Sequence, residues 1–236
     1  MNNFGLPEEL GWRFDSLYQW KLSRKYPMTV EHIEIGGHTF QINKITDPTA
    51  ALEEAVAANS MDSFATPYWA ELWPSAHRVE RICYRKCYSQ RHSTVLELGC
   101  GMGLVGIVAG HFGASVVLND REDDALRLAE LNYLINLSTV PEVLQFDWIA
   151  PVQRQFSLIL AADVVYELAI YQPLLHTFRT MLAPGGEIWL AEPNRPIAKD
   201  FFKVLSDNNF VWEMIPKKVT RNGRETRISV YIIRRK

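Results

Sequence analysis

From residue 93 to residue 208, short apolar segments alternate with longer amphipathic ones. The apolar segments are 94–98, 115–119, 142–146, 158–161 and 187–191. The amphipathic segments, with apolar residues at helical spacing, are 103–112, 122–136, 171–182 and 197–208. Segment 158–161 is apolar on both faces, as a parallel strand covered by helices must be. The alternation therefore predicts an α/β fold, a doubly wound and mostly parallel sheet.

The two ends of the chain depart from this alternation. Residues 210–219 and 226–235 read as two strands around Asn222-Gly223, which is a strong hairpin signal, so we expect the sheet to finish with an antiparallel pair. At the other end we expect a helix over 7–25, a hairpin over 31–45 with a glycine turn, and a short helix near 48–58. Residues 1–60 hold too few apolar residues for a core of their own. We therefore predict that they form an accessory cap on the substrate side of a domain spanning 61–236.

A glycine-rich turn follows the first strand of the alternating region. Four glycines, Gly99, Gly101, Gly103 and Gly106, fall within eight residues just before a predicted helix. Glycine lets the backbone turn sharply and approach a ligand closely, and a helix N-terminus adds N–H groups with positive potential. The last three glycines formally match the Gly-x-Gly-x-x-Gly pattern of dinucleotide sites. The turn therefore predicts a nucleotide-type cofactor without saying which one.

Acidic residues beside the turn favour S-adenosylmethionine over a dinucleotide. Glu97 lies inside the strand, where its carboxylate can face the positively charged amino group of a methionine moiety but would repel a pyrophosphate. Asp120 ends the next strand, where an acid can receive ribose hydroxyls of either cofactor. Asp147 and Trp148 follow the third strand, where they can contact an adenine amino group and cover its ring.

Three segments resemble one family of methyltransferases. Residues 97–103 look like motif I of class I methyltransferases, and Asp163-Val164-Val165-Tyr166 looks like the Asp-x-x-Tyr signature of family 16 of the seven-β-strand methyltransferases, which includes many protein lysine methyltransferases. Residues 67–75 resemble the Trp-Pro segment that precedes motif I in that group. The resemblance implies a Rossmann-like, seven-stranded sheet whose seventh strand is antiparallel, with S-adenosylmethionine as cofactor.

The same resemblance implies a set of site residues. It places Asp163 and Tyr166 at the reacting centre as catalytic residues. The residues that it places around the cofactor are Trp69, Trp73, Glu97, Gly99, Gly101, Gly103, Asp120, Asp147, Trp148 and Ala162. Enzymes that methylate planar nitrogens commonly carry two prolines after the acid of the signature, and here Val164 and Val165 stand there, so an amine acceptor fits better. A carboxylate beside an amine also favours its charged form, so we expect Asp163 to orient the acceptor or cofactor.

These observations predict an S-adenosylmethionine-dependent methyltransferase that acts on a nitrogen, foremost a lysine side chain of a protein. A small amine or a heteroaromatic nitrogen is an alternative acceptor. A nicotinamide-dependent oxidoreductase would need the dinucleotide reading of the turn and a catalytic Tyr-x-x-x-Lys or His, but Ile170 stands four residues after Tyr166. A non-catalytic binding module that grips a partner with its basic end is the remaining alternative.

Charge and cysteine content bear on partners and compartment. The net charge is −2, so we do not expect nucleic acid as a substrate. Residues 217–236 carry eight Lys and Arg against Glu225, which fits either a charged hairpin edge or a surface for an acidic partner. No apolar run approaches the ~18 residues of a membrane span, and the three cysteines suggest neither a disulfide framework nor a metal site. We expect a cytoplasmic protein without a metal and predict no oligomeric state.

Overall fold

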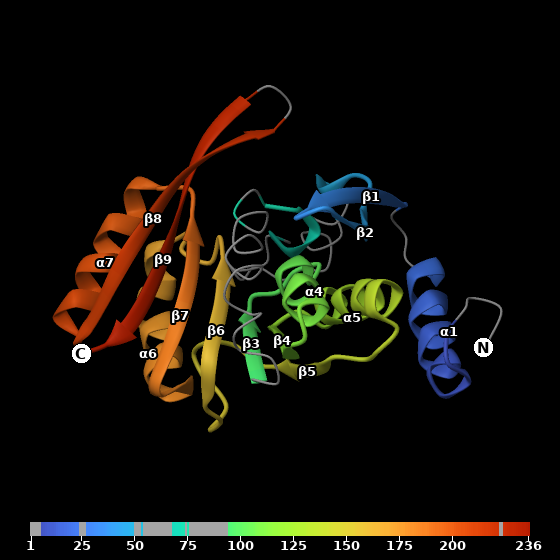
Figure 1. Ribbon diagram of the computed structural model, residues 1–236, viewed down its shortest axis with the longest axis horizontal. Helices are drawn as coiled ribbons and strands as arrows, with labels where there is room; N and C mark the ends of the chain where they lie inside the picture. The colour runs from blue at the N-terminus through green and yellow to red at the C-terminus, as the bar shows by residue number, and fades with distance from the viewer. Residues whose placement is uncertain are drawn as a thin grey trace.

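The computed structural model describes residues 6–23, 27–49, 53, 68–73, 75, 94–221 and 224–236. A seven-stranded sheet in the order β5-β4-β3-β6-β7-β9-β8 forms its centre (Figure 1). The strands are β3 (Thr94–Leu98), β4 (Ser115–Asp120), β5 (Glu142–Gln145), β6 (Phe156–Ala162), β7 (Leu182–Glu192), β8 (Phe210–Arg221) and β9 (Arg224–Arg235). The first five are parallel, and β9 runs antiparallel to both β7 and β8. The predicted doubly wound sheet with an antiparallel end is confirmed.

Helices cover both faces of the sheet. They are α4 (Leu104–His111), α5 (Asp123–Leu137), α6 (Tyr171–Met181) and α7 (Pro196–Asp207). Neighbouring residues of β3 point to opposite layers: Val95 belongs to the apolar cluster that contains α4 and α5 residues, and Leu96 to the cluster that contains α6 and α7 residues. Both faces of the strand are therefore buried, which explains its unbroken apolar sequence.

The start of β7 differs from the prediction. The strand begins at Leu182, whereas the sequence indicates a start at Glu187. Its pairing with β6 shifts between Phe156 and Leu158, and Gly185 has a φ of 73°. Pro184 and two glycines at 185–186 read as a loop, but they form an irregular extension of the strand because a bulge absorbs them.

The N-terminal elements form an additional layer on α5 and α4. They are α1 (Glu8–Ser23), β1 (Met28–Ile35) and β2 (His38–Ile45), as predicted, except that residues 24–26 and most of the predicted helix 48–58 lie outside the described residues. Phe14 and Leu17 of α1 pack against Leu131 and Leu134 of α5. Within the described part of the chain, the pocket presented below is lined by residues from 68 onward. The described residues of the N-terminal layer thus cover the α4–α5 face, where the apolar stripe of α1 packs against α5.

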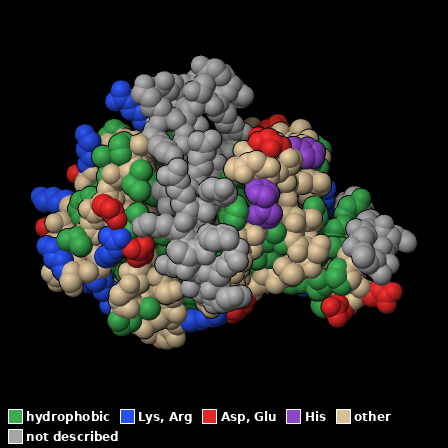
Figure 2. Space-filling model, viewed as in Figure 1, with side chains coloured by type: hydrophobic (Ala, Val, Ile, Leu, Met, Phe, Trp, Pro, Cys, Tyr) green, Lys and Arg blue, Asp and Glu red, His purple; other side chains and the backbone are tan. Residues whose placement is uncertain are grey.

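Part of the basic C-terminal segment stabilises the sheet edge. Arg234 forms ion pairs with Glu187 of β7 and Glu213 of β8, and Arg235 donates to the carbonyl of Leu182. Lys and Arg side chains gather on the side of the molecule where α6, α7 and β8 lie (Figure 2). The side chains of 217–226 lie outside the described residues, as do Cys83 and Cys87. In the part that the structure describes, no helix is both long and apolar enough to cross a membrane.

Candidate functional site

The glycine turn connects β3 to α4 with a left-handed backbone at three positions. Gly99, Gly101 and Gly103 have φ of 62°, 51° and 80°, a region that side chains other than glycine rarely adopt. Its N–H groups are used inside the protein. The Cys100 N–H donates to the Asn119 carbonyl at 2.8 Å, the Gly103 N–H to Cys100 at 2.8 Å, and the Gly101 N–H to the Asp120 carboxylate at 3.0 Å. These three groups are therefore not available to bind a pyrophosphate.

Gly106, the last glycine of the dinucleotide-like pattern, has a packing role. A Cβ atom there would meet Glu97 Oε2 and Leu118 Cδ2 at 2.6 Å. Its N–H donates to Glu97 Oε2 at 2.7 Å, so the carboxyl of β3 holds the first turn of α4 in place. Glu97 is 4% exposed, and burial raises its pKa to about 8. The same side chain contributes to the pocket lining.

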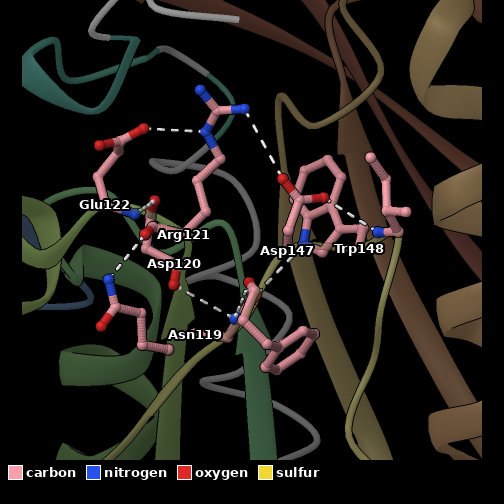
Figure 3. Close-up of polar contacts among 9 residues, drawn as sticks. Asn119, Asp120, Arg121, Glu122, Asp147 and Trp148 are labelled. Carbon is pink, nitrogen blue, oxygen red and sulfur yellow. Dashed lines mark hydrogen bonds and ion pairs between the residues drawn. The ribbon is translucent and has the colours of Figure 1, made fainter.

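Asp120 closes the turn from the neighbouring strand. Its carboxylate accepts the Gly101 N–H through one oxygen and the Glu122 N–H, at 3.1 Å, through the other. Burial raises its pKa to about 6. The next residue, Arg121, reaches across the pocket rim: it donates to Glu122 at 2.9 Å and lies 3.8 Å from Asp147 (Figure 3). Two loops at the carboxyl ends of β4 and β5 are thereby linked.

Trp148 is held by Asn119, a residue that the sequence reasoning did not select. The Trp148 Nε1–H donates to Asn119 Oδ1 at 3.2 Å (Figure 3). The Asn119 amide donates to the Leu144 and Phe146 carbonyls at 3.0 Å each. The indole lies over the turn, since a Cβ atom on Gly99 would meet Trp148 Cζ2 at 3.1 Å. The available signal is a buried amide that follows three apolar residues near the end of β4. The neighbouring Asp147 accepts the Ile149 N–H at 3.0 Å.

Aromatic side chains form one wall of the site. The Tyr68 ring lies 4.9 Å from the Tyr166 ring and 6.1 Å from the Trp73 ring, measured between centroids. Trp73 Nε1–H donates to the Tyr68 carbonyl at 2.8 Å, which fixes the indole. Burial raises the pKa of Tyr166 to about 12, so its hydroxyl stays protonated at neutral pH. The other predicted tryptophan, Trp69, lies with its backbone 3.6 Å from the position of a Cβ on Gly101.

Asp163 is buried, and each of its two carboxylate oxygens accepts a hydrogen bond. It has a left-handed φ of 59° and is 7% exposed. One carboxylate oxygen accepts the Ser75 N–H at 2.9 Å, and the other accepts Arg195 Nη2–H at 2.9 Å. Burial raises its pKa, while Arg195 and Ser75 oppose that rise. Sequence reasoning missed both partners because they stand far from Asp163 in the chain.

A pocket of about 370 Å³ brings the predicted residues together at the carboxyl edge of the parallel strands, where open α/β sheets bind ligands. Of the predicted residues only Gly103 lies outside the lining, because it faces Ala129 of α5. Among the described residues, the lining contains six carboxylates and two guanidiniums: Glu71, Glu97, Asp120, Glu122, Asp147, Asp163, Arg121 and Arg195. Such a pocket suits a cationic ligand with an aromatic ring and does not suit a pyrophosphate. Among the residues described, no group of three or more His, Cys, Asp and Glu is placed to hold a metal ion.

Known proteins are similar to this chain in sequence or in fold. The sequence model of the lysine methyltransferase family matches residues 61–208. The mouse protein-lysine methyltransferase METTL21E is 36% identical over 129 residues, which are 47% of this chain and 50% of the mouse protein. The zebrafish electron transfer flavoprotein beta subunit lysine methyltransferase is 31% identical over 140 residues, 58% of this chain and 54% of the zebrafish protein.

The chain thus spans about half the length of these curated relatives. Among solved structures, a ribosomal protein L11 methylase from Lactobacillus delbrueckii subsp. bulgaricus has the same fold, with a TM-score of 0.54 and 21% identity over 68% of this chain and 79% of that one. The family match covers more than half of the sequence and includes the glycine turn, Asp120, Asp163 and Arg195. The chain therefore belongs to the lysine methyltransferase family.

Proposed function

We propose that this protein transfers a methyl group from S-adenosylmethionine to the ε-amino group of a lysine in a protein substrate. The observation that carries the proposal is the acidic, aromatic pocket on the glycine turn, within the segment that matches the lysine methyltransferase family. The names of the mouse and zebrafish relatives support a lysine in a protein as the acceptor.

The residues around the turn fit the parts of that cofactor. Glu97 is the residue for the amino group of the methionine end, and Asp120 for the two ribose hydroxyls. Trp148, held by Asn119, offers a flat apolar surface to adenine, and Asp147 stands at the same end of the pocket. When bound, the cofactor supplies a methyl group on a positively charged sulfur, and the carboxylates of the pocket stabilise a cation there.

The aromatic wall and Asp163 define the acceptor side. Tyr68, Trp73 and Tyr166 can enclose a lysine side chain, exclude water from its amine and so lower the pKa of that amine. Asp163 is fixed by the Ser75 N–H and by Arg195. Because a carboxylate beside an amine favours the charged form of the amine, Asp163 orients the acceptor and is not the base. The proton of the lysine leaves to water. Alignment of a neutral nucleophile with the methyl group is then what the site contributes to the rate.

Two alternatives have less support. A dinucleotide would meet a turn whose Cys100, Gly101 and Gly103 N–H groups are committed and a lining rich in carboxylates. A small amine acceptor would use the same chemistry, but the relatives named above act on proteins by name.

The experiment is methyl transfer from isotope-labelled S-adenosylmethionine to a cytosolic protein extract, followed by mass spectrometry of the digested proteins. We expect labelled methyl-lysine with the wild type and at least tenfold less with Asp120→Asn. A surface variant on α7, Asp207→Asn, is the matched control and keeps the wild-type rate. Label confined to small molecules would contradict the protein acceptor. Failure of the purified protein to bind S-adenosylhomocysteine in calorimetry would contradict the methyltransferase itself.

A further inference from the structure

Arg195 lines the pocket and contacts three side chains, those of Asp163, Glu192 and Trp73. It lies between the end of β7 and the start of α7, and its guanidinium donates to Asp163 Oδ1 at 2.9 Å and lies 3.2 Å from Glu192 Oε2. The Arg195 N–H donates to the other oxygen of Glu192 at 2.9 Å, which anchors the backbone as well. The guanidinium carbon lies 5.8 Å from the centre of the Trp73 ring, within cation–π range.

The environment of this cation is well defined. Asp163 comes from the loop after β6, and Glu192, 0% exposed, from the end of β7. Among the described residues, Tyr171 of α6 and Tyr231 of β9 also interact with Glu192, and Asp200 of α7 interacts with Tyr171. Burial raises the pKa of Glu192 to about 7, so at neutral pH this carboxyl carries a proton for part of the time. Arg195 then compensates mainly the charge of Asp163.

That charge matters to the acceptor. A carboxylate within a few ångströms of an amine raises the pKa of the amine by about 1 to 3 units, and an ammonium cannot accept a methyl group. An uncompensated Asp163 would therefore hold an incoming lysine in its unreactive form. A fixed guanidinium on Asp163 offsets this effect, while the carboxylate still accepts the Ser75 N–H.

We propose that Arg195 is a positioning residue that neutralises Asp163 and braces Trp73, so that the acceptor lysine enters the pocket as a neutral amine. The inference rests on the proposed lysine methylation and adds a residue to it. The role proposed for Arg195 implies that the acid limb of the pH–rate profile, where the rate falls as the pH is lowered, depends on the charge at position 195 and not only on the shape of that side chain.

The test compares wild type, Arg195→Lys and Arg195→Gln in the extract assay at pH 6.5 to 9.5. For Arg195→Gln we expect the acid limb to move up by about one pH unit, which is a tenfold loss below pH 7.5 that recovers at high pH. Arg195→Lys keeps the positive charge and moves the limb by less than half a unit. Arg179→Gln, on the exposed side of α6, is the matched control without a shift. A loss for Arg195→Gln that is equal at every pH, or no loss, would overturn the proposal.

Two further measurements separate this inference from the proposed function. Calorimetry with S-adenosylhomocysteine should give a Kd within twofold of wild type for Arg195→Gln, since Arg195 acts on the acceptor side. Carbon-13 NMR of aspartate-labelled protein follows the Asp163 carboxyl directly and needs no substrate. We expect its pKa to be higher in Arg195→Gln than in wild type. If the extract shows no methyl-lysine although the cofactor product binds, the acceptor class is wrong, and an unchanged Asp163 titration would then refute the role of Arg195 independently.

Discussion

At the scale of single residues, burial raises the pKa of carboxyl groups that line the pocket. Burial raises the pKa of Glu97 from 4.5 to about 8. Glu97 of the folded protein therefore keeps a proton that the same residue in the unfolded chain loses above pH 4.5. The contribution of this proton to the stability of the fold is complete below pH 4.5 and is lost as the pH rises through about 8. A cationic ligand favours the ionised carboxylate and must displace this proton.

We therefore expect Glu97 to release up to about one proton when S-adenosylmethionine binds at pH 7. We also expect S-adenosylmethionine to bind more tightly as the pH rises from 6 to 8. Calorimetry in two buffers with different ionisation enthalpies measures the released protons. Glu97→Gln keeps an oxygen for the Gly106 N–H but has no proton to lose, so the release should fall to near zero. Equal release by wild type and variant would refute the pairing of Glu97 with the cationic end of the cofactor.

The residues that the sequence missed share one property. Asn119, Ser75 and Arg195 act through partners 29, 88 and 32 positions away in the chain. Periodicity and motif spacing describe neighbours along the chain, so they indicate Asp163 but not the groups that bond it. The glycines, Asp120 and Trp148 were predictable because each stands at the carboxyl end of a strand, which the fold alone brings to one edge.

At the scale of elements, Asn132 of α5 ties three segments together. Its side chain accepts the Asn43 N–H of β2 at 2.8 Å and donates to the carbonyls of Asn43 and Met102 at 3.1 Å. One turn later, Asn136 makes similar bonds to Gln41 but is only half-buried. The hairpin and the glycine turn are thereby held against the same helix.

Replacing Asn132 by alanine should lower the free energy of unfolding by about 2 to 4 kcal/mol. The buried backbone groups of Asn43 and Met102 would lose the side chain that they bond, at a place where water cannot take over its hydrogen bonds. Asn136→Ala, where water can enter, should cost about 1 kcal/mol. Urea denaturation followed by circular dichroism measures both values. Equal losses for the two variants would mean that burial does not determine the cost.

The elements themselves were largely predictable from the sequence. The buried parallel strands of this sheet are apolar on both faces and so stand out from the amphipathic helices between them. The exception is the first half of β7, where Pro184 and Gly185 signal a turn but tertiary pairing with Phe156 draws the chain into the sheet. Bulges of this kind depend on the partner strand, which local sequence does not specify.

At the scale of the whole molecule, the N-terminal layer is joined to the α/β domain by a shared apolar cluster. Leu17 of α1 is 1% exposed and packs with Leu131 and Leu134 of α5. We therefore expect Leu17→Ala to lower the free energy of unfolding by about 2 to 5 kcal/mol while unfolding stays a single transition. Near- and far-ultraviolet circular dichroism should report the same midpoint. Two separate transitions would show instead that the first 60 residues behave as an independent cap.

The order in which the chain enters the sheet divides the pocket between two consecutive lengths of polypeptide. The chain up to Trp148 contributes the glycine turn, Asp120 and Trp148 together with the aromatic residues Tyr68 and Trp73. The chain from β6 onward contributes Asp163, Tyr166 and Arg195, because β6 returns to the centre beside β3. A backbone cut between Ile149 and Phe156 would thus yield two fragments, neither of which holds all the residues that line the pocket. The proposed methyl transfer would resume only when the halves meet again, which makes this connection a natural place to engineer a split reporter of protein proximity.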